Sequence, residues 1–298
     1  MFKFTVIFIL FFICQIQAQS IESLRQNIEQ IISSKDATVG VAILGTNKED
    51  TLSINGDKRF PMQSVFKFHI GVVVLSEIDK GKYSLEQEVK IEKHELLPGL
   101  WSPIREKYPD GVTLTLAEIL QFTISVSDNV GCDLLLRLLG GANNVEEYFH
   151  RAGFIDISIK INEEVMQNNW ELQFQNWITP VTANEILKAV YNNKNLLSQS
   201  SYEFFWKTLK ETSTGINRLK GNLPDGTVVA HKTGSSGTNK TTGITAAVND
   251  IGIVFLPDGS YYIISVFVTD SKEDFTTNEK IIADIGKAAW DYFTNSSK

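Results

Sequence analysis

Residues 243–269 read GITAAVNDIGIVFLPDGSYYIISVFVT and contain two apolar, β-branched runs on either side of Pro257-Asp258-Gly259. Runs of this composition favour β-strands, and Pro, Asp and Gly are typical of tight turns. We therefore predict strands at Gly243–Phe255 and Tyr261–Thr269 that pair as an antiparallel hairpin. This hairpin makes an antiparallel sheet the basis of the predicted fold.

Further elements are expected towards both ends of the chain. Val228–His231 is a strand candidate before the hairpin, and Ile281–Phe293 has helical spacing after it. Near the N-terminus, Ile21–Ser33 has helical spacing and Thr38–Leu44 is rich in β-branched and apolar residues. We expect no strand between Leu44 and Val228.

The middle of the chain is predicted to be mainly helical. Apolar residues recur at helical spacing in Val65–Lys80, Leu116–Ser125, Val130–Leu139, Val145–Ala152 and Ala183–Asn192. The predicted fold class is α/β of the α+β type, an antiparallel sheet flanked by helices with an inserted, mainly helical domain. We place the sheet domain at residues 19–62 and 195–298 and the helical domain at residues 63–194, with a cleft between two packed lobes.

Composition and charge exclude some classes of function. Of the 298 residues, 43% are hydrophobic, which is enough to bury a substantial core in one or two domains. The formal net charge is -7 and Lys and Arg form no block, which argues against nucleic-acid binding. We expect a small-molecule substrate and a monomer.

The first residues have the layout of a secretory signal peptide. Lys3 precedes an apolar run from Phe4 to Ile13, and Ala18 offers a small residue for cleavage, which places the signal at residues 1–18. The apolar run is too short to span a bilayer comfortably, and no later segment approaches the required length. We predict an exported protein, periplasmic or secreted, without a transmembrane helix or stable membrane insertion.

The chain has two cysteines. Cys14 follows the bulky Phe12 and Ile13, which do not resemble the small residues expected before a lipidated cysteine. Once the signal is removed, Cys132 is the only cysteine left, so no intramolecular disulfide can form. We expect Cys132 to be a buried packing residue.

Ser64-Val65-Phe66-Lys67 places a hydroxyl and an amine at the start of a predicted helix. Ser64 and Lys67 are three residues apart, so their side chains share a face and can meet. Lys67 can take the serine proton if burial and nearby positive charge keep the amine neutral. The alternative is that Ser64 merely caps the helix, because serine is favoured at that position.

Two more motifs follow. Ser127-Asp128-Asn129 could simply cap the next helix, and Asp128 is expected to orient this loop. Lys232-Thr233-Gly234 follows the strand ending at His231, which predicts Lys232 at a sheet edge facing the cleft and Gly234 where the substrate backbone approaches. A plain turn is the alternative. Each motif is weak alone, but the ordered set favours a serine acyl-transfer site.

The three motifs together resemble those of class A serine β-lactamases and penicillin-binding proteins. The resemblance implies that Ser64 attacks the β-lactam carbonyl to form an acyl-enzyme and that Ser127 relays a proton to the leaving nitrogen. It implies an oxyanion hole made by the backbone N–H groups of Ser64 and Ser235. Whether Lys67 or Glu163 accepts the serine proton stays open.

The same resemblance assigns the binding residues. Lys232 supplies positive charge, Thr233 binds the substrate carboxylate and Asn129 binds the amide side chain of the substrate. Arg218 resembles a second carboxylate-binding cation. A solvated surface arginine is the alternative, and the nearby Lys220 could be mistaken for this cation. Trp101 matches an aromatic wall of the cleft, although core packing also explains a tryptophan.

A loop glutamate separates hydrolysis from mere acylation. The family carries Glu-x-x-Leu-Asn here, whereas this chain has Glu163-Glu164-Val165-Met166-Gln167 between Ile159 and Trp177. Met166 at the leucine position makes Glu163 the candidate water-activating base and Glu164 the alternative, with Gln167 helping to hold the water. An exposed acidic loop is the non-catalytic explanation.

The resemblance implies hydrolysis of penicillins and cephalosporins, and so antibiotic resistance, without a metal or organic cofactor. Gln63 and Gln167 are similar to an extended-spectrum branch, which implies turnover of bulky oxyimino cephalosporins. His94-Glu95-Leu96-Leu97-Pro98 lacks the second histidine of a zinc-protease helix. The alternatives are a D,D-peptidase or penicillin-binding protein, a serine glutaminase, and a non-catalytic β-lactam sensor.

Overall fold

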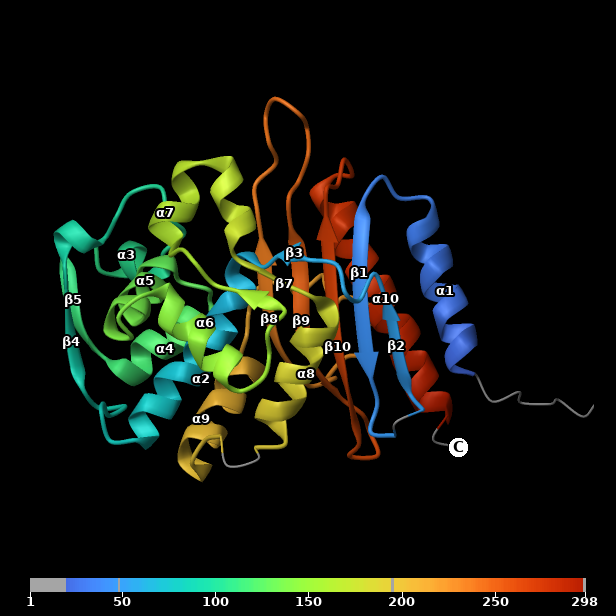
Figure 1. The fold of residues 1–298 in the computed structure, drawn as a ribbon, viewed down its shortest axis with the longest axis horizontal. Coiled ribbons are helices and arrows are strands. Elements are labelled where there is room, and N and C mark those ends of the chain that lie inside the picture. The colour runs from blue at the N-terminus through green and yellow to red at the C-terminus, as the bar shows by residue number, and fades with distance from the viewer. Residues whose placement is uncertain (1–19, 48, 194–195, 297–298) are drawn as a thin grey trace, which may run out of the picture.

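A five-stranded antiparallel sheet organises the molecule (Figure 1). The computed structural model describes residues 20–47, 49–193 and 196–296. The strand order is β2-β1-β10-β9-β8, with β1 at Thr38–Leu44, β2 at Thr51–Ile54, β8 at Val229–Ser235, β9 at Val248–Phe255 and β10 at Tyr261–Thr269. The predicted hairpin is confirmed, because β9 and β10 pair along their length. Strand β1 pairs with β10, so the two ends of the chain share one sheet.

Several predicted strand boundaries are wrong. β8 continues through Ser235, so the Lys232-Thr233-Gly234 motif lies within an edge strand and not after it. β9 begins only at Val248, because the preceding residues form a loop that is closed by the bridge between Thr238 and Thr245.

Strands also occur between residues 44 and 228, where none was expected. They are β2, the short strands β3 (Phe60–Pro61), β6 (Ile157–Ser158) and β7 (Trp177–Ile178), and the paired β4 (Glu88–Glu92) and β5 (Gly111–Thr115). Two-residue strands are too short to show an alternating pattern. β4 and β5 form a separate two-stranded sheet and bury few side chains, so their sequences lack a strong apolar signal.

The described helices agree broadly with the prediction. The α-helices are α1 (Ile21–Ser33), α2 (Phe66–Asp79), α3 (Pro103–Lys107), α4 (Leu116–Ser125), α5 (Asn129–Leu138), α6 (Ala142–Arg151), α7 (Glu163–Asn168), α8 (Pro180–Tyr191), α9 (Gln199–Lys210) and α10 (Phe275–Ser296). Short 3₁₀ turns cover Gln63–Val65, Lys93–Glu95 and Trp170–Gln175. α9 was not predicted, because buried Ser201 and Thr208 interrupt its apolar period.

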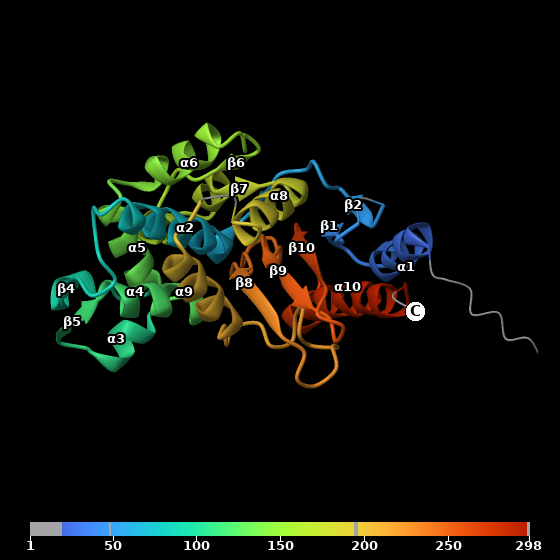
Figure 2. The same cartoon turned by 90° about the horizontal axis from the view of Figure 1, so that it is seen from below.

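Helices cover both faces of the sheet. Figure 2 shows α10 on one face and α8 and α2 on the other. One apolar core lies between the sheet and α1 and α10, and a second joins the opposite face to the central helices. Within the second core, α2 buries every residue from Phe66 to Ser76. The nucleophile motif therefore lies at the start of a rigid, enclosed helix.

The division into two domains stays a prediction. α8, on the helical side of the boundary at residue 194, contacts β1 and β10. α9, on the sheet side of that boundary, contacts α2 and α4 as well as β8. The helical and sheet regions thus share packing on both sides of the predicted boundary.

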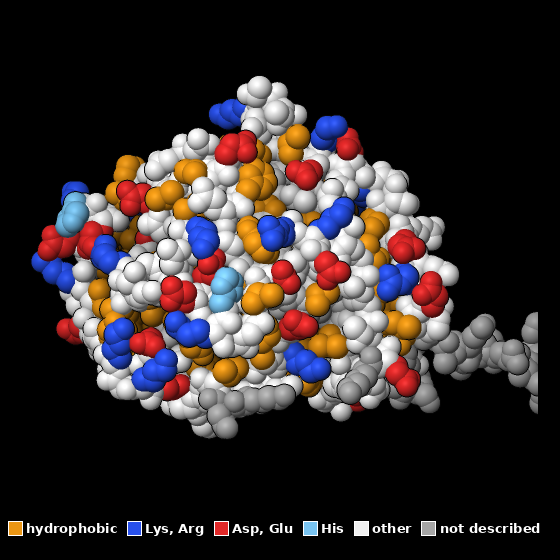
Figure 3. Space-filling model, in the orientation of Figure 1, with side chains coloured by type: hydrophobic (Ala, Val, Ile, Leu, Met, Phe, Trp, Pro, Cys, Tyr) orange, Lys and Arg blue, Asp and Glu red, His pale blue; other side chains and the backbone are white. Residues whose placement is uncertain are grey.

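The surface, the helix lengths and Cys132 can be compared with the predictions for membrane insertion and cysteine packing. Charged side chains of both signs are interspersed over the face in Figure 3. No helix among the described residues is long and apolar enough to cross a bilayer. The predicted signal peptide and Cys14 lie outside the described residues. Cys132 is buried and unpaired, which confirms its packing role.

His69 on α2 makes the stability of this core sensitive to acid. Its ring packs against Phe68 and Phe149, and burial lowers the pKa of His69 to about 3 from 6.5. Between these values the unfolded chain takes up a proton that the folded protein does not, so stability falls as the pH falls. The loss is roughly 1.4 kcal/mol for each pH unit below 6.5.

Urea unfolding at pH 7 and pH 5 tests this prediction with His69→Leu as the comparison. The unaltered protein should lose about 2 kcal/mol more stability between the two pH values than the variant does. An equal loss in both proteins would show that His69 does not carry the effect.

Candidate active site

Ser64 lies in the 3₁₀ turn that leads into α2. Neither this turn nor α2 has a side-chain cap, and the Ser64 hydroxyl instead accepts a hydrogen bond of 2.7 Å from Lys67 Nζ. The preceding Gln63 has a φ of 47°, a left-handed conformation that is uncommon for a residue other than glycine. The simple helix-cap interpretation of Ser64 is therefore wrong.

Lys67 connects Ser64 to two other predicted site residues. Its Nζ also donates to Asn129 Oδ1 at 2.6 Å and to Glu163 Oε1 at 2.5 Å. An ammonium group has three N–H donors and no acceptor, and here all three have an oxygen partner. The geometry is therefore that of a charged lysine paired with a carboxylate.

The pKa of Lys67 points the same way. Burial is the largest single cause and would lower this pKa, but the charge of Glu163, its hydrogen bond to Lys67 and the smaller effects of Cys132 and Asp133 together raise the pKa of Lys67 above its ordinary value. The condition that burial and nearby positive charge keep the Lys67 amine neutral is thus not met in the resting site. A carboxylate that faces the amine keeps the proton on it.

The glutamate loop places Glu163 in the site and Glu164 outside it. Glu163 is 6% exposed at the start of α7, whereas Glu164 is exposed. Both backbone N–H groups donate to Asp133, Glu163 to Oδ1 at 2.8 Å and Glu164 to Oδ2 at 2.9 Å. Burial raises the pKa of Asp133 to about 6. Asp133 therefore fixes the beginning of α7 so that Glu163 faces Lys67.

The Ser127 loop is held by the residue that follows it. The Asp128 carboxylate accepts hydrogen bonds from Gly131 N, Ser102 Oγ and Ile104 N, at 2.7 to 2.9 Å, which confirms its role in orienting the loop. Ser127 has a φ of 63°, so the loop holds this serine in a sparsely populated conformation.

Trp101 borders the same loop at the surface. It is 56% exposed, so it is not a core residue. Its indole Nε1 donates to Val126 O at 3.0 Å, and its own carbonyl accepts from Asn129 N at 3.0 Å. The ring is therefore fixed at the edge of the site, as expected for an aromatic wall.

Lys232 reaches Ser127 from the edge strand β8. Its Nζ donates to Ser127 Oγ at 3.0 Å and to Thr233 O at 2.9 Å. Burial and then the charge of Lys67 hold the pKa of Lys232 well below its ordinary value. The predicted position at a sheet edge beside the site is confirmed.

Gly234 packs closely against the turn that carries Ser64, and the predicted approach of the substrate backbone to this glycine stays a prediction. A Cβ at this residue would lie 2.3 Å from Met62 O and 3.2 Å from Val65 N. The close approach that requires glycine is therefore that of the nucleophile turn. Asn249 on β9 strengthens the same junction, because its Nδ2 donates to Pro61 O at 2.8 Å.

Arg218 is buried beside β8 and is not a solvated surface arginine. It is 3% exposed and its Nη2 donates to Ser235 Oγ at 2.6 Å. Its Nη1 donates to Gly234 O at 3.0 Å and its Nε to Glu279 Oε1 at 3.1 Å. Nearby, the hydroxyls of Thr214 and Thr233 are 2.7 Å apart.

These residues surround two adjoining hollows. The inner hollow is lined by Gln63, Ser64, Trp101, Ser127, Asn129, Glu163, Thr214, Gly215, Arg218, Thr233, Gly234 and Ser235. The outer hollow shares Gln63, Asn129, Glu163 and Ser235, and adds Gly99, Leu100, Met166, Gln167, Asn169, Trp170, Gln173, Ser236, Gly237 and Thr238. Lys67 and Lys232 lie beneath the inner hollow and bond to its lining side chains. The predicted site residues therefore meet in one place, with Gln167 in its outer part.

Sequence reasoning missed several residues that build this site. Asp133, Asn249 and Thr214 belong to none of the quoted motifs, and their roles depend on segments distant in the chain. Gln173 likewise accepts a hydrogen bond of 2.7 Å from Gln63 Nε2, which joins the nucleophile turn to the loop after α7. The proximity of Asp133 to the Ser127 motif was the only available signal.

Comparisons with known proteins agree with this geometry. The model of the beta-lactamase enzyme family matches residues 23–293. Beta-lactamase VEB-1 of Pseudomonas aeruginosa is 52% identical over 291 residues, which is 97% of each chain. The crystal structure of TLA-1 extended spectrum beta-lactamase is 49% identical, with a TM-score of 0.89 over 93% of this chain and 99% of that chain.

A third similar protein specifies the class. The crystal structure of a representative class A beta-lactamase from Bacteroides cellulosilyticus is 37% identical, with a TM-score of 0.88 over 94% of this chain and 99% of that one. The predicted family and α+β fold class are both confirmed. The chain belongs to the class A β-lactamases.

Proposed function

We propose that this β-lactamase opens the lactam amide through an acyl-enzyme on Ser64. The observation that carries the proposal is the position of Lys67, which bonds to both Ser64 Oγ and Glu163 Oε1. A serine needs a nearby base to become a nucleophile, and a carboxylate one step away can receive the proton. Ser64, Lys67 and Glu163 thus form a continuous path for proton transfer.

Acylation follows this path in the proposed mechanism. Lys67 gives a proton to Glu163, and the resulting neutral amine takes the Ser64 proton as Oγ attacks the lactam carbonyl. Ser64 and Ser235 both line the inner hollow, and their backbone N–H groups are proposed to stabilise the oxyanion. Ser127, held by Lys232, then gives its proton to the leaving nitrogen as the C–N bond breaks. Lys67 passes the proton taken from Ser64 on to Ser127, and Glu163 returns its proton to Lys67, so that Glu163 is ionised again.

Deacylation uses the same carboxylate. Glu163, ionised again, removes a proton from water as that water attacks the ester carbonyl, and Ser64 leaves with a proton returned through Lys67. Gln167 lines the outer hollow with Glu163 and is proposed to help hold the water. The amide of Gln167 is one methylene longer than the asparagine of the family pattern, which shifts the position it can reach.

The proposed substrates are penicillins and cephalosporins, including those with bulky oxyimino groups. Thr233 and Arg218 line the inner hollow and offer donors for the substrate carboxylate, and Asn129 faces the same hollow for the amide side chain. Lys232, buried beside Thr233, adds positive charge. The outer hollow offers further space beyond the reacting centre. Relatives such as TLA-1 carry the name extended-spectrum beta-lactamase, which supports this breadth.

Steady-state kinetics with a simple penicillin, a simple cephalosporin and an oxyimino cephalosporin test this function. All three should be hydrolysed, with kcat/KM above about 10⁴ M⁻¹s⁻¹ for the simple substrates. Negligible turnover of all three would contradict the proposed function. Turnover of only the simple compounds would contradict the extended spectrum alone.

The protein is also proposed to be exported and monomeric. The signal sequence at Met1–Ala18 would deliver the enzyme to the periplasm or outside the cell, where it would act as a monomer and confer antibiotic resistance.

A further inference from the structure

A buried pair, His231 and Asp250, lies behind the carboxylate side of the inner hollow. Both side chains have 0% exposure, and His231 Nδ1 lies 2.9 and 3.0 Å from the two carboxylate oxygens of Asp250. A Cβ at the facing Gly252 would lie 2.7 Å from the Cβ of His231, so the glycine leaves room for the ring. A buried carboxylate persists only with such partners.

Asp250 also holds the backbone next to Arg218. Its Oδ2 accepts a hydrogen bond of 3.3 Å from Leu219 N, directly after the arginine. Arg218 N donates to Gly215 O at 2.9 Å, so the turn between them is closed. The carboxylate thereby fixes the point from which the Arg218 side chain extends towards Ser235.

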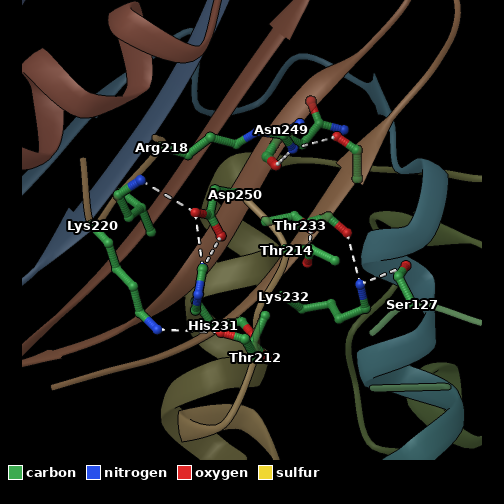
Figure 4. A network of polar contacts seen from close by, with 12 residues as sticks. Ser127, Thr212, Thr214, Arg218, Lys220, His231, Lys232, Thr233, Asn249 and Asp250 are labelled. Carbon is green, nitrogen blue, oxygen red and sulfur yellow. Dashed lines mark hydrogen bonds and ion pairs between the residues drawn. The ribbon is translucent and has the colours of Figure 1, made fainter. Parts of the chain in front are cut away.

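The backbone of His231 holds the other end of the same segment, while its ring holds Asp250. Its carbonyl accepts a hydrogen bond of 2.9 Å from Thr212 Oγ1, and Lys220 Nζ donates to Thr212 O at 3.3 Å. Figure 4 shows the pair between Lys220 and Thr233. The segment 212–219, which carries three residues of the inner hollow, Thr214, Gly215 and Arg218, is therefore anchored at both ends.

The charge of Asp250 acts on the same side of the site. It opposes the effect of burial on the pKa values of both Lys232 and Lys220. Asp250 thus supports the positive charge of Lys232 without touching the inner hollow. The contacts of the pair and the charge of Asp250 therefore act on residues proposed to bind the substrate carboxylate, and not on those around the reacting carbonyl.

We propose that His231 and Asp250 are positioning residues that hold the segment 212–219 and its arginine in the geometry needed to bind the carboxylate of a β-lactam. This inference rests on the proposed function and deepens it. It assigns to the pair a role in substrate recognition. Loss of the pair should therefore raise KM for carboxylate-bearing substrates while kcat changes little.

The test compares a penicillin with the methyl ester of the same penicillin. His231→Phe keeps a planar ring but removes the donor to Asp250. It should raise KM for the acid about tenfold relative to the unaltered protein. The kcat for the acid, and both kcat and KM for the ester, should stay within about threefold of the unaltered values. His231→Asn, whose amide can donate to Asp250, should restore KM for the acid to within about threefold.

Two further variants separate recognition from stability. Ser265, on β10 of the same sheet, donates an equally buried hydrogen bond of 2.6 Å to Asn184 of α8. Ser265→Ala removes this bond and should leave the preference for acid over ester unchanged. If His231→Phe does not fold, Asp250→Asn is tested in its place. Its single acceptor oxygen replaces the two that Asp250 uses, so it should give the same acid-specific rise in KM.

Equal losses for acid and ester in the pair variants, or unchanged KM for the acid, would overturn the proposal. A shift in preference caused equally by Ser265→Ala would also overturn it. Absence of turnover by the unaltered protein would instead contradict the proposed function, so the two failures are distinguishable.

Discussion

Replacing Glu163 by Gln is expected to stop the reaction at the acyl-enzyme. The amide cannot remove a proton from water, so deacylation loses its general base, which typically contributes 10²- to about 10⁴-fold. Lys67 keeps its hydrogen bonds to Ser64 and Asn129, and loss of the Glu163 charge lowers the pKa of Lys67 towards the neutral amine. Acylation should therefore persist, and intact-protein mass should show a stable adduct.

Glu164→Gln is the matched control. Glu164 is the next residue on α7, has the same side chain and is exposed outside the site. Its variant should turn over normally. An accumulating adduct in Glu164→Gln, together with normal turnover in Glu163→Gln, would show that the glutamates have exchanged roles.

Ser64→Ala is expected to abolish covalent catalysis. Removing an acyl-transfer nucleophile costs about 10⁶-fold in kcat in the best-studied case. Among the residues that the structure describes, no other hydroxyl shares the contact with Lys67. Neither turnover nor a mass adduct should be detected with any β-lactam. Binding of the intact substrate should survive, because the carboxylate and amide contacts do not involve Oγ.

Ser76→Ala provides a control on the same helix. Ser76 is 5% exposed and lies on α2 away from the hollows, so its variant tests whether a change in this buried helix is itself damaging. Normal turnover is expected. A mass adduct in Ser64→Ala would mean that another residue is the nucleophile.

Much of this fold could be predicted where a segment repeats one pattern. α1, α4, β1 and β10 have the predicted bounds, because each carries a clear helical or strand periodicity. The failures arise where tertiary contacts decide the structure. β8 continues through Ser235 because that part of the strand pairs with β9, although the sequence ends its apolar run at His231.

The site was predictable as a set of motifs but not as a geometry. The motifs identified Ser64, Lys67 and Lys232, whereas the charge state of Lys67 depends on contact with Glu163 across 96 residues. Asp133 decides which glutamate enters the site, and its place near the Ser127 motif does not reveal that it contacts Glu163 and Glu164. Long-range pairing of this kind leaves no periodic signal.

The most direct test of the central claim is hydrolysis of a chromogenic cephalosporin by the purified mature protein, with intact mass recorded during the reaction. We predict rapid turnover with a transient adduct on Ser64. A long-lived adduct with little hydrolysis would contradict the role given to Glu163 and would instead favour a penicillin-binding protein or a β-lactam sensor.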